Sequence, residues 1–179
     1  MTISLITPPT GEPVTAVLAK AYARITHSYE DSLVDLWISA AREHCENVLD
    51  RPIRQAGYRV SEVSPDAAIA VAGLGPFTVT QARSITGGVP TTIPSTDYSS
   101  AWDYGQMVIT HNTAWPSADS IEIDFTVGYA DVPMPIKQAI LVLVGDMDRN
   151  REAATTEAVG YSQNPAVQNL LYPYRVLGL

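Results

Sequence analysis

The chain has 179 residues, of which 46% are hydrophobic and 17% charged, and its formal net charge is −8. This composition is typical of a folded globular protein long enough for one domain with a substantial core. Because binding to a nucleic-acid backbone requires clustered Lys and Arg, the acidic balance argues against nucleic-acid binding. Cys45 is the single cysteine, which excludes an intramolecular disulfide and favours a reducing compartment.

The first 13 residues contain three prolines and a glycine, and they predict an extended arm. They lack the basic and apolar regions of a signal peptide. Thr15 can cap a helix over about 16–25. Helical spacing predicts that its buried face is formed by Val17, Leu18, Ala21 and Ile25.

A second helix is predicted over about 29–50 and has the clearest pattern in the chain. Ser28 and Asp31 form a start similar to a capping box, and Arg51-Pro52 ends the helix. Cys45 lies on the apolar face, which favours a packed thiol over a reactive one. The apolar face consists of Leu33, Val34, Trp37, Ile38, Ala41, Cys45 and Val48.

Between residues 55 and 128 the pattern changes to short strands and turns. Ser120–Val127 is the best strand: its alternate apolar residues predict a buried face, and Glu122 and Asp124 predict a solvated one. Residues 91–104 are polar and irregular, and they predict a long loop. The other predicted strands cover 57–63, 67–72, 77–85 and 107–110. The fold class is therefore α+β, with an antiparallel β-rich region inserted between helices.

A third helix is predicted over 135–151 and is apolar at every position from Ala139 to Val144. A helix that is apolar all round must be covered on most of its circumference. It is too short to cross a membrane, which takes about 20 apolar residues. Two interpretations remain open: a core helix of one small bundle, or a helix partly covered by a second subunit. The candidates for a subunit interface are Trp37, Ile140, Leu143 and Met147.

The search for chemistry gives no catalytic, metal-binding or cofactor-binding residue. The three histidines lie in different predicted elements, without metal-ligand spacing, and no G-x-S-x-G motif is present. Gly73-Leu74-Gly75 lacks the third glycine of a phosphate-binding loop. An alternative function remains, a small hydrolase or carbohydrate-binding module that uses the loop 91–118. Its aromatic residues are Tyr98, Trp102, Tyr104 and Trp115.

Four segments together resemble the head–tail connector proteins, also called adaptor or head-completion proteins, of long-tailed phages and gene transfer agents. Their order and spacing cover nearly the whole chain. This sequence differs in having Asp50 where the family commonly has glycine before the arginine that ends the second helix. The four segments are Ile6–Pro9 with Glu12–Thr15, Ala40–Glu43 leading to Arg51-Pro52, Trp115-Pro116 with Val127–Tyr129 and Val132–Ile140, and Asn150–Glu152 with Leu170–Arg175.

The resemblance implies a structural protein without catalysis or cofactors, which forms a ring, usually twelvefold, under the portal. Residues 1–179 would form one connector domain whose helices build the ring wall, with 55–128 as an insertion. DNA would pass through the channel without specific binding, and a stopper or another neck protein would dock next. The protein would be made in the cytoplasm of a bacterial host and reside in the virion neck, without contact to a membrane.

The resemblance also implies that the C-terminal part, a loop and tail over 153–179 with a short helix over 165–171, reaches into the portal. Deleting 165–179 would then leave the domain folded but abolish portal attachment. The residues expected to contact the portal are Leu170, Leu171, Tyr172, Tyr174, Arg175, Val176 and Leu177.

Overall fold

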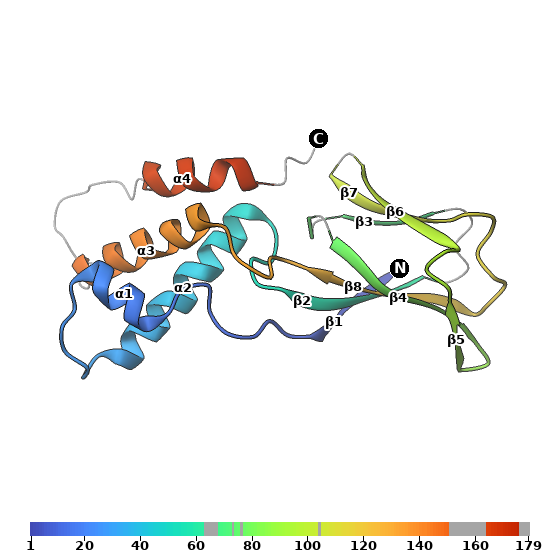
Figure 1. Ribbon diagram of the computed structural model, residues 1–179, viewed down its shortest axis with the longest axis horizontal. Coiled ribbons are helices and arrows are strands. Elements are labelled where there is room, and N and C mark those ends of the chain that lie inside the picture. Colours follow the sequence, from blue (N-terminus) through green and yellow to red (C-terminus); the bar gives the residue numbers. More distant parts are fainter. Residues whose placement is uncertain (63–67, 73, 76, 104, 151–163, 176–179) are drawn as a thin grey trace. The chain divides into compact units, whose positions relative to one another are not determined.

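The computed structural model describes residues 1–62, 68–72, 74–75, 77–103, 105–150 and 164–175, and it has an α+β fold (Figure 1). The chain divides into two compact units. The β-rich unit contains the described residues of 1–10 and 50–130, and the helical unit contains those of 11–49 and 131–175. Both units are built from segments that lie far apart in the sequence.

Five strands form the larger sheet of the β-rich unit: β1 (Thr2–Thr7), β2 (Ala56–Glu62), β4 (Phe77–Thr86), β5 (Val89–Ile93) and β8 (Ser120–Val127). They are antiparallel, in the order β1-β2-β8-β4-β5. The central strand is β8, in which Ile123 lies opposite Val60 of β2 and Ala82 of β4. The sequence of β8 alternates because one of its faces lies in the apolar core, whereas the other carries the polar residues Glu122 and Asp124.

A second sheet consists of β3 (Ala68–Ala72), β7 (Gln106–His111) and β6 (Tyr98–Asp103), in the order β3-β7-β6. The two sheets share one apolar core, and Figure 1 shows them lying over one another. The predicted inner face of β8 is confirmed, because all four of its apolar residues are buried. The core residues include Val60, Ile69, Val71, Phe77, Ile109, Ile121, Ile123, Phe125 and Val127.

The extended conformation predicted for the first residues is present, but Thr2–Thr7 also pairs with β2 as the strand β1. The predicted loop 91–104 is wrong, because it contains most of β5 and all of β6. These three strands lie at sheet edges and are hydrogen-bonded on one side only. Because most of their residues are exposed, their sequences do not need the alternation that identifies a half-buried strand.

The helical unit contains α1 (Ala16–Ala23), α2 (Asp31–Leu49), α3 (Met134–Arg149) and α4 (Pro165–Leu171), followed by a 3₁₀ turn over Tyr172–Tyr174. The helix α3 packs against each of the other three. Its buried residues cover one wide face and include Ile136, Ala139, Ile140 and Val144. Pro133 and Pro135 begin α3 without a side-chain cap.

The predicted helices 16–25, 29–50 and 135–151 extend one or two residues beyond the observed ends, whereas 165–171 agrees with α4. Thr15 caps α1 as expected, since its Oγ1 accepts a hydrogen bond from the Leu18 N–H at 3.2 Å. Asp50 follows α2 with a φ of 53°, a left-handed conformation that glycine adopts freely and Asp tolerates.

The packed thiol predicted for Cys45 is confirmed. The side chain is fully buried on the apolar face of α2, where burial, with a smaller contribution from the charge of Glu46, raises the pKa of Cys45 to about 12. The thiol therefore stays protonated and inert at neutral pH.

The predicted buried face of α1 is wrong. Val17 is 79% exposed and Leu18 is 46% exposed, whereas Ala19 is fully buried. The side of α1 that packs carries alanines at positions 16, 19 and 23, whose small side chains allow the helix to approach its neighbours closely. The larger apolar residues are left on the outside.

Candidate assembly surfaces

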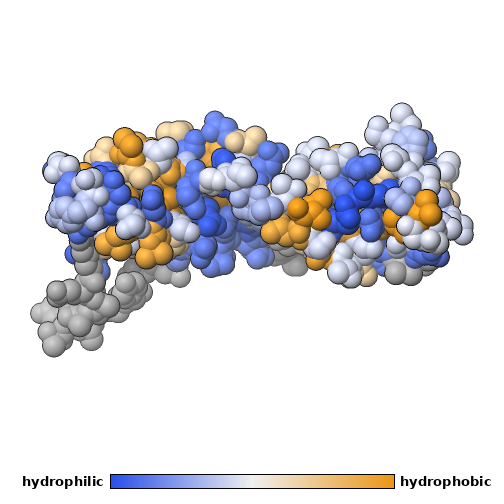
Figure 2. Space-filling view, turned by 90° about the horizontal axis from the view of Figure 1, so that it is seen from below, coloured by the Kyte–Doolittle hydropathy of each residue, from blue (hydrophilic) through white to orange (hydrophobic). Residues whose placement is uncertain are grey.

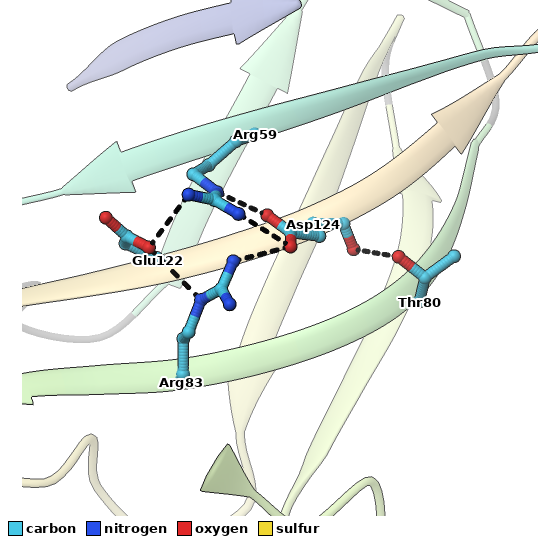
Figure 3. A network of polar contacts seen from close by, with 5 residues as sticks. All are labelled: Arg59, Thr80, Arg83, Glu122 and Asp124. Atoms are coloured by element: carbon cyan, nitrogen blue, oxygen red, sulfur yellow. Dashed lines mark hydrogen bonds and ion pairs between the residues drawn. The ribbon is translucent and has the colours of Figure 1, made fainter. Parts of the chain in front are cut away.

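The most extensive polar cluster of the described residues lies on the outer face of the larger sheet (Figure 3). Asp124 of β8 accepts hydrogen bonds from Arg59 Nε at 2.6 Å and from Arg83 Nη2 at 2.6 Å. Glu122 Oε2 lies 3.1 Å from Arg83 Nε and 3.5 Å from Arg59 Nη1. The prediction of a solvated carboxylate face is therefore wrong, because two guanidinium groups from the neighbouring strands cover it.

This cluster is electrically balanced and closed, with two positive and two negative side chains. Desolvation opposes ionisation of Asp124, but the hydrogen bonds and charges of Arg59 and Arg83 outweigh it and lower the pKa of Asp124. A carboxylate held by two guanidinium groups cannot act as a general acid at neutral pH. The cluster therefore serves to tie β2, β8 and β4 together.

Replacing Asp124 with asparagine is expected to lower the free energy of unfolding by about 2 kcal/mol at neutral pH, because both guanidinium groups lose a charged partner. Since folding lowers the pKa of Asp124, its stabilisation is complete above the unfolded-state value of about 3.9 and is lost as pH falls through the lower folded value. Urea titrations from pH 7 to pH 2 should thus show the two proteins converge below about pH 4.

Asp103→Asn provides a matched control, because Asp103 is an exposed carboxylate on β6 of the same unit. It should change stability by less than about 0.5 kcal/mol. Equal losses in the two variants would contradict the structural role of the cluster.

The aromatic residues of the alternative function do not form one site in the part of the chain that is described. Trp115 is buried in the core between the two sheets, where its ring centroid lies 5.4 Å from that of His111, and Tyr98 packs against the same core. Trp102 is 40% exposed on the edge strand β6. Tyr104 lies outside the described residues. Two of these side chains therefore stabilise the sandwich instead of lining a cleft.

Neither a metal site nor a membrane-spanning helix is found in the described ranges. No group of three or more His, Cys, Asp or Glu side chains within them is placed to hold a metal ion. No helix that they contain is long and apolar enough to cross a membrane.

The residues expected to contact the portal differ in exposure. Leu171 is fully buried in the helical unit, and Leu170 and Tyr174 are half-buried. Tyr172 is 66% exposed, and Arg175 is exposed as well. Val176 and Leu177 lie outside the described residues. Of the described residues expected to contact the portal, Tyr172 and Arg175 are thus the exposed ones.

The four candidates for a subunit interface also differ in burial. Ile140 is fully buried in the helical unit's own core, so it leaves no surface for a second copy. Trp37, Leu143 and Met147 are half-buried. The side of α3 that carries Leu143 and Met147 is thus incompletely covered by its own chain.

Sequence reasoning missed one apolar surface, the outer face of α1 with Val17 and Leu18, at whose edge the partly exposed ring of Tyr22 lies beside Gly145 of α3. The signal for it was present, because Ala16, Ala19 and Ala23 share one helix face at the spacing of a packing interface. An alanine face that packs forces the larger residues of a short helix outward.

Comparison with known proteins gives a consistent result. The sequence matches the head completion protein family over residues 14–177. No curated protein sequence matches the chain.

Among solved structures, the chain is similar to a component of the neck of an empty GTA particle computed with C6 symmetry, with a TM-score of 0.74 and 19% identity. It is also similar to a component of the virion of a native gene transfer agent (GTA) particle, with a TM-score of 0.70 and 18% identity. A third match, in the neck of a native GTA particle computed with C12 symmetry, has a TM-score of 0.66 and 20% identity. Each covers 100% of this chain and 97% of the other.

The family match spans most of the chain and includes residues of both units, and the segments that suggested head–tail connectors fall within or beside it. The chain therefore belongs to the head completion protein family, and its role is that of a structural head–tail connector of a virion.

Proposed function

We propose that this connector forms a ring under the portal, extends the DNA channel and docks the next neck protein, without catalysis. The observation that carries the proposal is the family match over residues 14–177. The similarity in fold to components of necks computed with C6 and C12 symmetry supports a cyclic arrangement.

The physical properties of the chain fit such a ring. A closed ring requires two different surfaces on each copy that fit one another. The helical unit leaves apolar side chains exposed, which a neighbouring copy can cover. A net charge of −8 repels the DNA backbone, so that DNA can slide through the channel without sticking. In this arrangement the helices form the wall, and the region 55–128 is an insertion in the connector domain.

The end of α4 is the proposed portal-binding surface. Tyr172 follows the buried Leu171 directly, so its exposed ring is held by a helix that is anchored in the unit. Arg175 lies one turn further and adds an exposed guanidinium. Tyrosine and arginine are the residue types that most often dominate the free energy of protein–protein binding.

Replacing Tyr172 with alanine is expected to weaken binding to the purified portal at least tenfold, equivalent to about 1.4 kcal/mol or more. The matched control is Tyr29→Ala, which removes a tyrosine that is 79% exposed elsewhere on the helical unit. Titration of portal immobilised on a biosensor measures both variants, and negative-stain microscopy shows whether the wild-type chain forms a ring on the portal.

Each result of this experiment has a definite meaning. Failure of the wild-type chain to bind the portal would contradict the proposed function. Normal binding by Tyr172→Ala would leave the function standing and move the contact to another surface.

A further inference from the structure

The outer face of α1 is apolar and unusually exposed. Val17 is 79% exposed, Leu18 is 46% exposed and Tyr22 is 42% exposed. At 3.6 residues per turn, positions 17, 18, 21 and 22 cover an arc of about 140° that contains no charged residue. Lys20, the one charged residue of α1, lies off this arc and pairs with Asp31 at 2.5 Å. Apolar surface of this kind is visible on the helical unit in Figure 2.

The helical unit has a second exposed apolar position on the outer side of α2. Leu36 is 62% exposed, and by helical periodicity it points away from the buried stripe that contains Val34 and Ile38. Asp35, which precedes Leu36 and lies about 100° around the helix from it, is exposed, and so is Glu43, two turns further on the same side as Leu36. This surface therefore combines one large apolar side chain with two carboxylates.

The charges beside the two surfaces are opposite. Arg24 ends α1 in a left-handed conformation, with a φ of 59°, and is exposed. None of the ion pairs found in the described ranges involves Arg24 or Asp35. An apolar face with an arginine at its end and a leucine flanked by carboxylates are complementary in both polarity and charge.

We propose that the face of α1 formed by Val17, Leu18 and Tyr22 packs on the outer side of α2 of the next copy, around Leu36, with Arg24 beside Asp35. This contact rests on the proposed ring. A contact of the α1 face with itself would bring the two Arg24 side chains together and would close a two-fold dimer. A contact between two different faces repeats around a ring until it closes.

Cysteine cross-linking tests this contact in the full-length chain, assembled on the purified portal. Leu18→Cys and Leu36→Cys are made in separate chains, while the native Cys45 stays protected because it is fully buried. Mixing the two variants is expected to give a disulfide-linked dimer that neither variant gives alone. A chain that carries both substitutions should give a ladder of higher oligomers.

Two controls make the experiment specific. Val89→Cys places a thiol on a side chain that is 64% exposed on β5, and it should not cross-link to Leu18→Cys. Arg24→Glu in the chain that carries Leu18→Cys should reduce the Leu18–Leu36 cross-link at least threefold, and adding Asp35→Arg to the chain that carries Leu36→Cys should restore it.

The outcomes separate this contact from the ring itself. Cross-linking of Leu18→Cys to itself, or portal-bound rings without the mixed product, would overturn the contact while the proposed function stands. If the wild-type chain does not bind the portal, both the proposed contact and the proposed function are contradicted.

Discussion

Replacing Gly128 with alanine is expected to prevent the β-rich unit from folding, with a loss of more than about 4 kcal/mol. Gly128 has a φ of +90°, and a Cβ atom there would lie 2.3 Å from the carbonyl oxygen of Arg54 and 2.7 Å from its carbonyl carbon. Both atoms belong to the backbone, so no side-chain rotation can relieve the overlap. The two segments would have to move apart.

That separation would break the junction at which β8 ends. The Tyr129 N–H donates to the carbonyl oxygen of Ile53 at 2.9 Å, directly beside the glycine. The guanidinium of Arg51 donates to the Tyr129 hydroxyl and lies 5.1 Å from the centre of its ring. Ile53 itself is fully buried. All of these contacts therefore require the close approach of the segment around Arg54 to the segment around Gly128.

Urea denaturation followed by circular dichroism measures the effect, and Gly88→Ala is the matched control. Gly88 also has a positive φ, of +79°, in the turn between β4 and β5, but an added Cβ there meets nothing within 4 Å. Its substitution should cost about 1 kcal/mol for the backbone conformation alone. A Gly128 variant no less stable than the Gly88 variant would show that the overlap is absent in solution.

Replacing Leu171 with alanine is expected to destabilise the helical unit by about 3 kcal/mol. Leu171 is fully buried, with a relative exposure of 0%, and its helix α4 packs against α3. Truncation to alanine removes apolar contacts and leaves a cavity, because the surrounding helices relax only in part. Thermal unfolding measured by circular dichroism reports the loss as a lower Tm.

The neighbouring residue provides the contrast. Tyr172 is 66% exposed, so Tyr172→Ala should change stability by less than about 0.5 kcal/mol. Equal losses at the two positions would mean that α4 does not pack on the unit as described.

The same packing changes what a C-terminal deletion can test. Removing 165–179 takes away Val167 and Leu171, both of which are buried. Such a truncated chain is expected to lose stability as well as portal binding, contrary to the expectation from the sequence that the domain stays folded. Point substitutions at exposed positions such as Tyr172 are therefore the informative variants.

Residue pattern alone was sufficient for the elements that bury one face. The helix α2 and the strand β8 were predicted closely, because a buried stripe restricts residue type at every third or fourth position in a helix and at every second position in a strand. The order and spacing of four short segments also indicated the head completion family, which the match over residues 14–177 shows.

Tertiary structure decided what periodicity cannot specify. Which face of α1 packs depended on the close approach that alanines allow, and the strands β1, β5 and β6 depended on partners distant in the sequence. Likewise, the carboxylates of β8 are paired and not solvated, because strand register brings Arg59 and Arg83 beside them. The local sequence pattern predicts which side chains are buried, because burial of apolar surface lowers the free energy wherever it occurs. Which residue each side chain contacts depends on segments distant in the sequence, which come together only when the chain folds.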